Sequence, residues 1–591
     1  MYDYRAPRRE FGFVIHEVLG AEAALAALGR DDVGQGLIDS VIEEGAKFAE
    51  GVLSPLNAQG DREGARYDDG AVVTAQGYRA AYQQFCRDGW AGMAAAPEYG
   101  GQGLPSIAHI AVGEMLCSAA MAWRMASGLS EGAVLALSRH ASEALKARFL
   151  GKIVTGAWTC TMCLTEPQAG TDLGLLRTRA EPAADGSFRL GGTKIFISWG
   201  EHDLTDNIVH LVLARLPDAA PGTRGISLFL VPKLIDGRPN GVRCDSIENK
   251  MGIHGSPTCV LSFEGAQGWL VGSPGGGLAC MFTMMNHARL GVGLQGLGLS
   301  ERALQASARY AFERLQGRSA RGALARDKAA DPIAAHADVR RMLLTQKALT
   351  EGQRLLAYQT ALLADVEHLG RDAPARERAG QLVALLVPIV KSLLTDSAME
   401  TTELAMQVHG GAGFIRETGV EQYLRDAKIT CIYEGTNGIQ ALDLLGRKVL
   451  ANGGATVKLL AEEIGATLAG ELAPALGPHA ATLRAKVEEW AELTRIVAAR
   501  VAKDPDELGA VAVDYLNYAG YVLVGWGWLR MANVAARRLA AGSAERAFYE
   551  GKLAAAAFYF ERLLPRTLAT AAAVRAGGAT LPALAPEHFA A

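Results

Sequence analysis

One glutamate in the sequence, Glu434, has the surroundings of a general base. It lies within Ile429–Gln440, between an apolar stretch and a glycine-containing turn. Burial among apolar groups raises the pKa of a carboxylate, and Gly435 lets a ligand approach the backbone closely. A base that removes a proton from a weak carbon acid must be desolvated, held still and basic enough. A glutamate that merely ends a helix in solvent is an equally good interpretation of this segment taken alone.

Three more segments carry groups that are suited to a cofactor. Gln407–Phe414 is a glycine-rich turn between two helical patterns, and exposed N–H groups at such a turn can bind a pyrophosphate. No strand precedes this turn, so it is not a Rossmann fingerprint. Cys163–Asp172 and Lys194–Gly200 each run from a strand pattern into polar residues, with hydroxyls and an aromatic ring at the strand ends. We expect the side chains at these strand ends to bind a flat heterocycle.

The composition excludes several classes of protein. The chain has 591 residues, 49% of them hydrophobic and 21% charged, with a net charge of −4, which is ordinary for a folded protein and unfavourable for binding polyanions. The Cys160–Cys163 pair has no second pair or nearby histidine, so no metal site is expected. The N-terminal residues are too charged for a signal sequence, and no apolar run approaches the roughly 20 residues that span a bilayer. We therefore expect a cytoplasmic protein without a membrane span.

The hydrophobic pattern changes along the chain and predicts a mostly α protein with a central β domain. Short alternating apolar stretches punctuated by Gly, Pro, Asp and Asn indicate a small antiparallel sheet or barrel, and long helical patterns flank it. Four of these patterns, at roughly 281–318, 333–370, 376–408 and 418–447, predict a four-helix bundle. The predicted parts are an N-terminal extension (1–35), an N-terminal helical domain (36–157), a β-barrel middle domain (158–280), a helical-bundle domain (281–450) and a C-terminal helical extension (451–591).

Taken together, the motifs resemble the acyl-CoA dehydrogenase family. The matching segments, in order, are TEPxAGTD, KxFIS, Lys250-Met251-Gly252, QVHGGAGF and RDAKITCIYEGTNGIQ. The resemblance runs from about residue 40 to 450. With its N-terminal leader and its extension after 450, the whole chain is similar to the long branch that includes 3-methylmercaptopropionyl-CoA dehydrogenases.

This resemblance implies a flavoenzyme that binds FAD in the cleft between its domains. Glu434 would remove the α-proton of an acyl-CoA thioester, and the β-hydrogen would leave as hydride to the flavin. The Glu434 N–H would bind the thioester carbonyl as part of an oxyanion hole. The implied FAD positions are Met162, Leu164, Thr165, Phe196, Ser198, Arg314, Gln407, Gly411 and Thr436, where Phe196 replaces the Trp of many relatives. The implied substrate positions are Thr171, Asn286, Arg289 and Gly435.

The resemblance leaves the substrate and the electron acceptor open. Electron-transfer flavoprotein is the expected acceptor, and an acyl-CoA oxidase that uses O₂ is the alternative within the fold. A DNA-associated flavoprotein would need a basic C-terminal region, but residues 451–591 hold 14 Lys+Arg and 14 Asp+Glu. A catalytically silent protein is disfavoured because the base and the cofactor positions are present. Because the Arg314 position reaches the FAD of a neighbouring subunit in relatives, we expect a homo-oligomer, either a dimer or a tetramer. The substrate is expected among 3-methylmercaptopropionyl-CoA and short- to long-chain acyl-CoAs.

Overall fold

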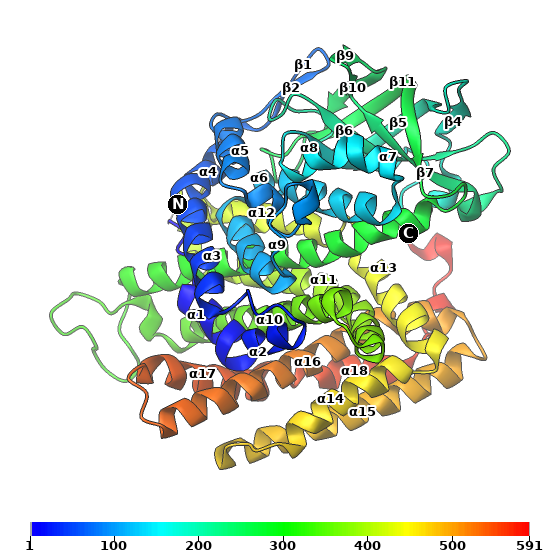
Figure 1. The fold of residues 1–591 in the computed structure, drawn as a ribbon. Helices are drawn as coiled ribbons and strands as arrows, with labels where there is room; N and C mark the ends of the chain where they lie inside the picture. The colour runs from blue at the N-terminus through cyan, green and yellow to red at the C-terminus, as the bar shows by residue number, and fades with distance from the viewer. Residues whose placement is uncertain (1–2, 590–591) are drawn as a thin grey trace.

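A computed structural model describes residues 3–589 and shows a helical protein built around one β domain (Figure 1). The β domain lies at one end, the long helices of the bundle cross the middle, and the C-terminal helices cover the opposite side (Figure 1). The predicted fold class is therefore confirmed.

The N-terminal part is a group of helices that ends in a long, sharply bent one. The longest element, α6 (Ser106–His140), has a non-helical backbone at Ala120 (φ −158°, ψ 81°), which divides it into two arms. His109 and Glu131, on different arms, lie 3.2 Å apart, so the arms fold back on each other. The other α-helices before the β domain are α1 (Arg8–Gly12), α2 (Ala21–Ala27), α3 (Gln35–Phe48), α4 (Ser54–Glu63), α5 (Tyr78–Arg87), α7 (Glu143–Leu145) and α8 (Gly151–Val154).

The middle domain is a seven-stranded sheet in the order β10-β11-β5-β4-β6-β3, with β7 joining β11 to β6. Most neighbours are antiparallel, as predicted. The exceptions are β3, which pairs parallel to β6, and a single parallel contact between β4 and β6, so the purely antiparallel prediction was wrong at these two places. The strands are β3 (Thr159–Cys163), β4 (Arg179–Pro182), β5 (Phe188–Ser198), β6 (Ile208–Arg215), β7 (Ile226–Pro232), β10 (Val242–Ile247) and β11 (Thr258–Val271).

The bundle contains three long helices, α9 (Gly277–Glu313), α10 (Ala337–Leu369) and α11 (Ala373–His409). The predicted fourth helix is interrupted, because α12 (Glu421–Thr430) and α13 (Asn437–Leu442) are separated by a turn at 431–436. The prediction of one continuous helix over 418–447 was wrong here. Consecutive left-handed residues in this turn are incompatible with a right-handed helix.

The C-terminal extension packs along the bundle. Trp528 of α16 lies against Gly352 of α10 and donates from its indole N–H to the carbonyl of Ala348 at 2.9 Å. A side chain at Gly352 would collide with this ring, so the glycine permits the close approach. The helices of the extension are α14 (Ala455–Ala469), α15 (Gly477–Val501), α16 (Asp506–Ala540), α17 (Arg546–Phe558) and α18 (Arg566–Ala576).

The N-terminal segment packs against the C-terminal extension as well as against its own neighbours in sequence. Residues of α1 (Arg8–Gly12) and of the following π-helical turn, η1 (Phe13–Val18), meet α17. Lys552 of α17 is buried and pairs with Glu10 and with Glu351 of α10, and the ring of Phe13 lies 5.4 Å from that of Phe548. The N-terminal segment thus packs together with α17 of the C-terminal extension.

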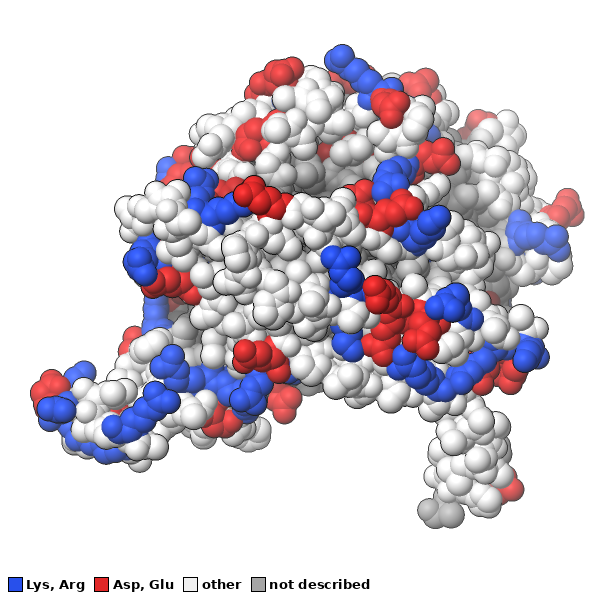
Figure 2. Space-filling view, turned by 90° about the horizontal axis from the view of Figure 1, so that it is seen from below, with Lys and Arg blue, Asp and Glu red and all other residues white. Residues whose placement is uncertain are grey.

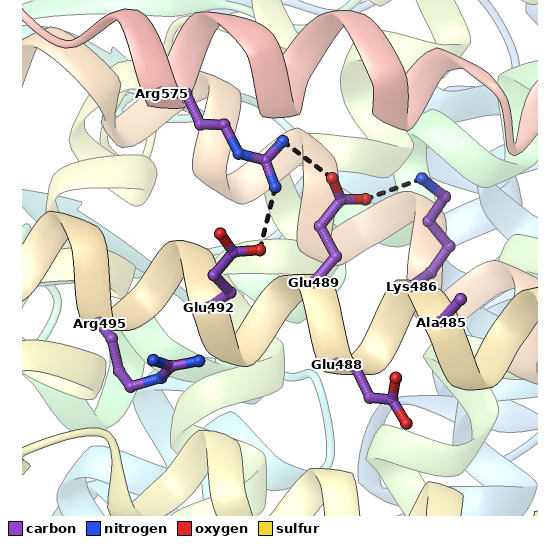
Figure 3. Close-up of a pocket in the computed structure, with 7 residues that line it drawn as sticks. All are labelled: Ala485, Lys486, Glu488, Glu489, Glu492, Arg495 and Arg575. Atoms are coloured by element: carbon purple, nitrogen blue, oxygen red, sulfur yellow. Dashed lines mark hydrogen bonds and ion pairs between the residues drawn. The ribbon is translucent and has the colours of Figure 1, made fainter.

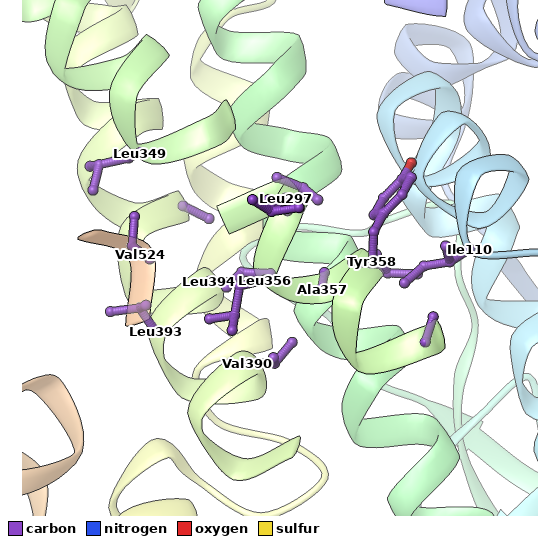
Figure 4. Packing of buried hydrophobic residues seen from close by; sticks show 14 of the residues in the cluster. Ile110, Leu297, Leu349, Leu356, Ala357, Tyr358, Val390, Leu393, Leu394 and Val524 are labelled. Atoms are coloured by element: carbon purple, nitrogen blue, oxygen red, sulfur yellow. The ribbon is translucent and has the colours of Figure 1, made fainter. Parts of the chain in front are cut away.

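One large core joins the helical parts, while the strands of the β domain are buried in two smaller cores. Figure 4 shows side chains from several helices packed side by side, with Tyr358 next to Ile110 at one edge of the view. The Tyr358 hydroxyl donates to the buried carboxylate of Glu114 at 2.9 Å. The labelled side chains come from α6, α9, α10, α11 and α16: Ile110, Leu297, Leu349, Leu356, Ala357, Tyr358, Val390, Leu393, Leu394 and Val524.

Two features of the helices and the surface bear on partners. Two helical segments, Ser106–His140 and Ala373–Phe414, are long and apolar enough to cross a membrane by length and composition alone. The apolar windows of these segments are 89% and 78% buried within the fold, as in core helices.

On the face of the molecule seen from below, basic and acidic side chains are interspersed (Figure 2).

Candidate active site

Glu434 lies in a strained turn at the centre of the site. Its φ is +57° and that of Gly435 is +83°, a left-handed conformation that costs a residue with a side chain about 1 to 2 kcal/mol. The amide of Gln440 in α13 holds this turn by donating to the carbonyls of Glu434 (3.2 Å) and Gly435 (3.1 Å). Among the hydrogen bonds of residues 3–589, none is donated by the Glu434 N–H. The turn therefore presents a carboxylate and a free backbone donor together.

The electrostatic surroundings of Glu434 are those of a base. Burial raises the pKa of its carboxyl to about 7, although the positive charges of Arg289 and Lys391 oppose the rise. A carboxylate with a pKa near neutrality is both ionised in part and basic enough to accept a proton from carbon.

Arg289 is a buried cation beside this turn. It lies on α9 and donates from Nη1 to Asp443 Oδ2 at 3.0 Å, while Nη2 is 3.8 Å from where a Cβ on Gly435 would lie. Asn286, one turn earlier, accepts from Arg289 Nη1 at 3.4 Å and is exposed. Arg289 Nε is buried without a partner in the described part of the chain. An unsatisfied buried donor in such a place is a group available to a ligand.

Lys391 is a site residue that the sequence interpretation missed. It lies on α11, is fully buried, and donates from Nζ to Asn437 Oδ1 at 2.8 Å. Burial lowers the pKa of its ammonium group to about 8, while the charges of Cys431, Asp396 and Glu434 favour the protonated form. The signal in the sequence was a lone charged residue within the largely apolar run Leu385–Leu394.

The two strands expected to hold a heterocycle lie side by side. Thr165, just after β3, accepts at its carbonyl from the N–H of Ile195 in β5 at 2.9 Å. Phe196 on β5 is left-handed (φ +59°) and 59% exposed, which leaves its ring free for a ligand to cover. Ser198 ends the same strand and is half-buried, Met162 is buried in β3, and Leu164 is half-buried next to Thr165.

A buried ion pair fixes the ends of these strands. Lys194 of β5 donates to Glu166 Oε1 at 2.8 Å and to the carbonyl of Leu164 at 2.9 Å. Glu166 also accepts from the N–H groups of Arg177 and Thr178. Burial opposes ionisation of Glu166, but Lys194 and these donors lower its pKa to about 2. The predicted substrate residue Thr171 lies beyond this anchor and is exposed.

The remaining predicted residues divide into two places. Thr436 begins α13, where its hydroxyl accepts from the N–H of Ile439 at 3.3 Å. Arg314 ends α9, 25 residues and about 37 Å of helix from Arg289 at 1.5 Å per residue. Gln407 and Gly411 lie at the C-terminal end of α11 and just after it. This end is next to the C-terminal end of α9, because the rings of Tyr310 and His409 stack with their centroids 4.3 Å apart. One chain therefore does not bring Arg314, Gln407 and Gly411 to Glu434.

A groove elsewhere on the surface has no link to this site. It lies between α15 and α18, has a volume of about 460 Å³, and is lined by charged side chains (Figure 3). Arg575 pairs with Glu489 and Glu492, and Lys486 pairs with Glu489, so these charges satisfy one another.

The comparisons with known proteins place the chain in a family. Four domains match in order: "Acyl-CoA dehydrogenase, N-terminal domain" (39–157), "Acyl-CoA dehydrogenase, middle domain" (161–266), "Acyl-CoA dehydrogenase, C-terminal domain" (275–450) and "Acetyl-CoA dehydrogenase C-terminal like" (460–585). Together with the fold and the Glu434 turn, they show that the chain belongs to the acyl-CoA dehydrogenase family. It is an oxidoreductase of that family.

Among its relatives is the 3-methylmercaptopropionyl-CoA dehydrogenase of Ruegeria pomeroyi, which is 43% identical over 95% of this chain and 96% of its own. A butyryl-CoA dehydrogenase of Syntrophomonas wolfei is 34% identical over 99% of both chains. The fold matches an acyl-CoA dehydrogenase of Bacillus anthracis solved with FAD, with a TM-score of 0.74 and 21% identity over 92% of this chain and 89% of that one.

Proposed function

We propose that the protein oxidises an acyl-CoA thioester to the 2-enoyl-CoA with FAD as its cofactor. The observation that carries this proposal is the Glu434 turn, which joins a base of pKa about 7 to a free backbone N–H beside the buried cation of Arg289. The family of the chain and the FAD-bound relative support the choice of cofactor.

The residues present fit FAD. The exposed ring of Phe196 offers an apolar surface for the flavin. Met162 in β3, Leu164 and Thr165 just after it, and Ser198 at the end of β5 would supply the neighbouring contacts. When bound, FAD supplies the acceptor for the hydride that leaves the β-carbon. Arg314, Gln407, Gly411 and Thr436 would hold the rest of the cofactor. Since Arg314, Gln407 and Gly411 lie at the far end of the bundle, they would serve the site of a second subunit, which supports a homo-oligomer.

Glu434 would take the α-proton while its own N–H holds the thioester carbonyl. This backbone donor would stabilise the negative charge that grows on the carbonyl oxygen as the proton leaves. Arg289 and Lys391 favour the ionised form of Glu434 before the reaction. We infer that Thr171, Asn286 and the Gly435 backbone contact the substrate, as the resemblance to the family implies.

The proposed electron acceptor is electron-transfer flavoprotein, and the proposed compartment is the cytoplasm. An oxidase would instead pass its electrons to O₂. The dehydrogenase and the oxidase are distinguished by whether the acceptor protein or air reoxidises the reduced protein.

The first test is anaerobic absorbance of the FAD-loaded protein during titration with acyl-CoAs from C4 to C16 and with 3-methylmercaptopropionyl-CoA. We expect at least one of them to bleach the flavin band. The Glu434→Gln variant should keep FAD but lose about 10² to 10⁴-fold in bleaching rate, the usual contribution of a general base. Full activity in this variant would contradict the role of Glu434.

A further inference from the structure

The segment after α18, residues 579–589, leaves the body of the molecule with apolar side chains exposed. It contains two short 3₁₀ turns, η14 (Leu581–Ala583) and η15 (Pro586–Phe589). Figure 2 shows it projecting at the lower right. Leu581 is 63% exposed, Leu584 45% and Phe589 75%. Residues 579–589 are called the C-terminal arm below. Gathered apolar side chains that a fold leaves in water mark interaction sites.

The attachment of the C-terminal arm fixes where it leaves the fold. Arg500 of α15 donates to the carbonyl of Arg575 at the end of α18 at 2.6 Å. Gly577 is left-handed (φ +72°), and a Cβ there would lie 2.7 Å from both Arg500 and Glu507. Glu507 of α16 accepts from the N–H of Gly578 at 3.0 Å. The arm therefore starts from a point that two other helices of the extension hold in place.

This starting point is at the Glu434 end of the molecule. Leu508, next to Glu507 on α16, lies 3.4 Å from where a Cβ on Gly446 would lie. Gly446 belongs to the π-helical turn η10 (Asp443–Val449), whose first residue pairs with Arg289. The base of the arm thus packs close to the segment that follows the Glu434 turn.

A second set of exposed apolar side chains lies at the opposite end of the bundle. Phe312 in the last turn of α9 is 67% exposed, and Phe414 and Ile415, after α11, are 83% and 52% exposed. Leu324, in the loop between α9 and α10, is 65% exposed. This loop projects at the left of Figure 1. These four residues are called the bundle-end patch.

The C-terminal arm does not reach the bundle-end patch of its own chain. Arg289 and Arg314 on α9 are separated by about 37 Å of helix, which is roughly the distance between the two ends of the bundle. Seven of the eleven residues of the arm are in 3₁₀ turns, which advance about 2 Å per residue, so the arm spans less than about 30 Å. The arm also lies at the right of Figure 1, away from the loop.

We propose that the C-terminal arm of one chain docks on the bundle-end patch of a second copy, whose own arm makes the same contact in return. In a two-fold dimer, a surface at one end of each chain meets the surface at the other end of its partner, so both exposed sets are covered at once. The inference goes beyond the proposed reaction, because it holds for any substrate that the protein oxidises.

The place of the bundle-end patch favours a second copy as its partner. The patch lies at the same end of the bundle as Arg314, Gln407 and Gly411, the residues proposed above to serve the FAD site of another subunit. The arm contact would therefore extend that interface. It would also join the arm of each chain to the helix ends that complete its own cofactor site.

The charges of the two surfaces are complementary. The loop of the patch carries exposed Arg321, Arg326 and Lys328 and one exposed acid, Asp327. Figure 2 shows basic side chains on the projection at the left of the molecule. The arm has one charged side chain, the exposed carboxylate of Glu587. Opposite charges at the rim of an apolar contact help to select the partner.

The first test measures how fast subunits exchange between two differently tagged preparations of the FAD-loaded protein. The arm variant Leu581→Ser/Phe589→Ser and the patch variant Phe312→Ser/Phe414→Ser change side chains that are exposed in the single chain. Each should exchange at least about tenfold faster than the wild type, because apolar contact area is lost. Combining the two variants should add little, since both remove the same contact.

The matched control is Val73→Ser/Leu135→Ser. These side chains are 37% and 40% exposed and lie on β2 (Ala71–Val73) and α6, outside both surfaces. The control should exchange at the wild-type rate. Flavin absorbance checks that every variant keeps its FAD.

The second test locates the contact. The Leu584→Cys variant, labelled with a benzophenone maleimide, is mixed with ¹⁵N-labelled wild-type protein, left to exchange subunits and irradiated. Mass spectrometry should find the arm joined to ¹⁵N peptides from residues 309–332 or 407–418, which shows a contact between chains.

Four results would overturn the arm contact. They are a monomeric mass for the FAD-loaded wild type, a wild-type exchange rate in the arm or the patch variant, equal acceleration in the control, and cross-links confined to unlabelled peptides or to other regions. The anaerobic flavin titration needs no contact between chains, so these results leave the proposed function standing.

Discussion

Replacing Glu434 with glutamine is expected to stabilise the protein at pH 8 while it removes activity. The native pKa of this carboxyl, about 7, lies above the ordinary value of 4.5 for a glutamate. Between these two values the native state binds more protons than the unfolded state, so native stability falls as pH rises from 4.5 to 7. Glutamine has the same shape and no proton to lose, and the variant should not show this fall.

The magnitude follows from the difference in pKa. About 2.5 units at 1.36 kcal/mol each give roughly 3 kcal/mol for the full transition. With an unfolding entropy of about 2.1 cal/mol/K per residue, a cooperative unit of this length has roughly 1.2 kcal/mol/K. The Tm of Glu434→Gln should then exceed that of the wild type by about 3 °C at pH 8.

Scanning calorimetry of the FAD-loaded proteins at pH 5 and pH 8 measures this difference in Tm between the variant and the wild type, which should be small at pH 5. Glu166→Gln provides the contrast, because the pKa of Glu166 is lowered to about 2. Its variant should be less stable than the wild type, by an amount that does not change between pH 5 and 8. A Glu434→Gln protein that is no more stable than the wild type at pH 8, or whose gap is the same at both pH values, would refute the reasoning.

Three further outcomes are expected. The kcat/KM should rise with unit slope through a midpoint near pH 7 as Glu434 ionises, and a midpoint below pH 5.5 in a rate profile would contradict this. Lys391→Met removes a positive charge near Glu434 and should move that midpoint up by about half a unit or more; an unmoved midpoint would show that Lys391 acts only on Asn437. Arg314→Ala should lower the ratio of flavin to protein absorbance without moving the midpoint, and full FAD retention would count against a site shared between subunits.

The sequence pointed to the parts of the site that are local in the chain. The apolar stretch and the glycine beside Glu434 suggested a base in a turn, but a glutamate that ends a helix in solvent fitted the segment equally well until the other motifs were considered. The two strands at Thr165 and Phe196 were found because each has its own local pattern. Helical periodicity extended the last bundle helix through the turn, since a left-handed backbone at a glutamate has no composition signal.

Features made by distant residues were not predictable in this way. The bend at Ala120 lies in a continuous helical pattern, and only packing of the two arms shows it. Lys391 looks like one polar residue on a helix until the fold places it beside Glu434. The parallel pairing of β3 with β6 depends on a crossover whose direction no alternation of residues encodes.

The contact of the N-terminal segment with α17 has a consequence for how the chain is made. Glu10 and Lys552 are 542 residues apart in sequence, and a ribosome adds about 5 to 20 residues per second. Phe13, fully buried beside Phe548, therefore waits roughly half a minute to two minutes after its synthesis before α17 exists, and Phe11 waits for Tyr358 of α10, on which it stacks. During synthesis these two rings are without the partners that bury them in the finished protein.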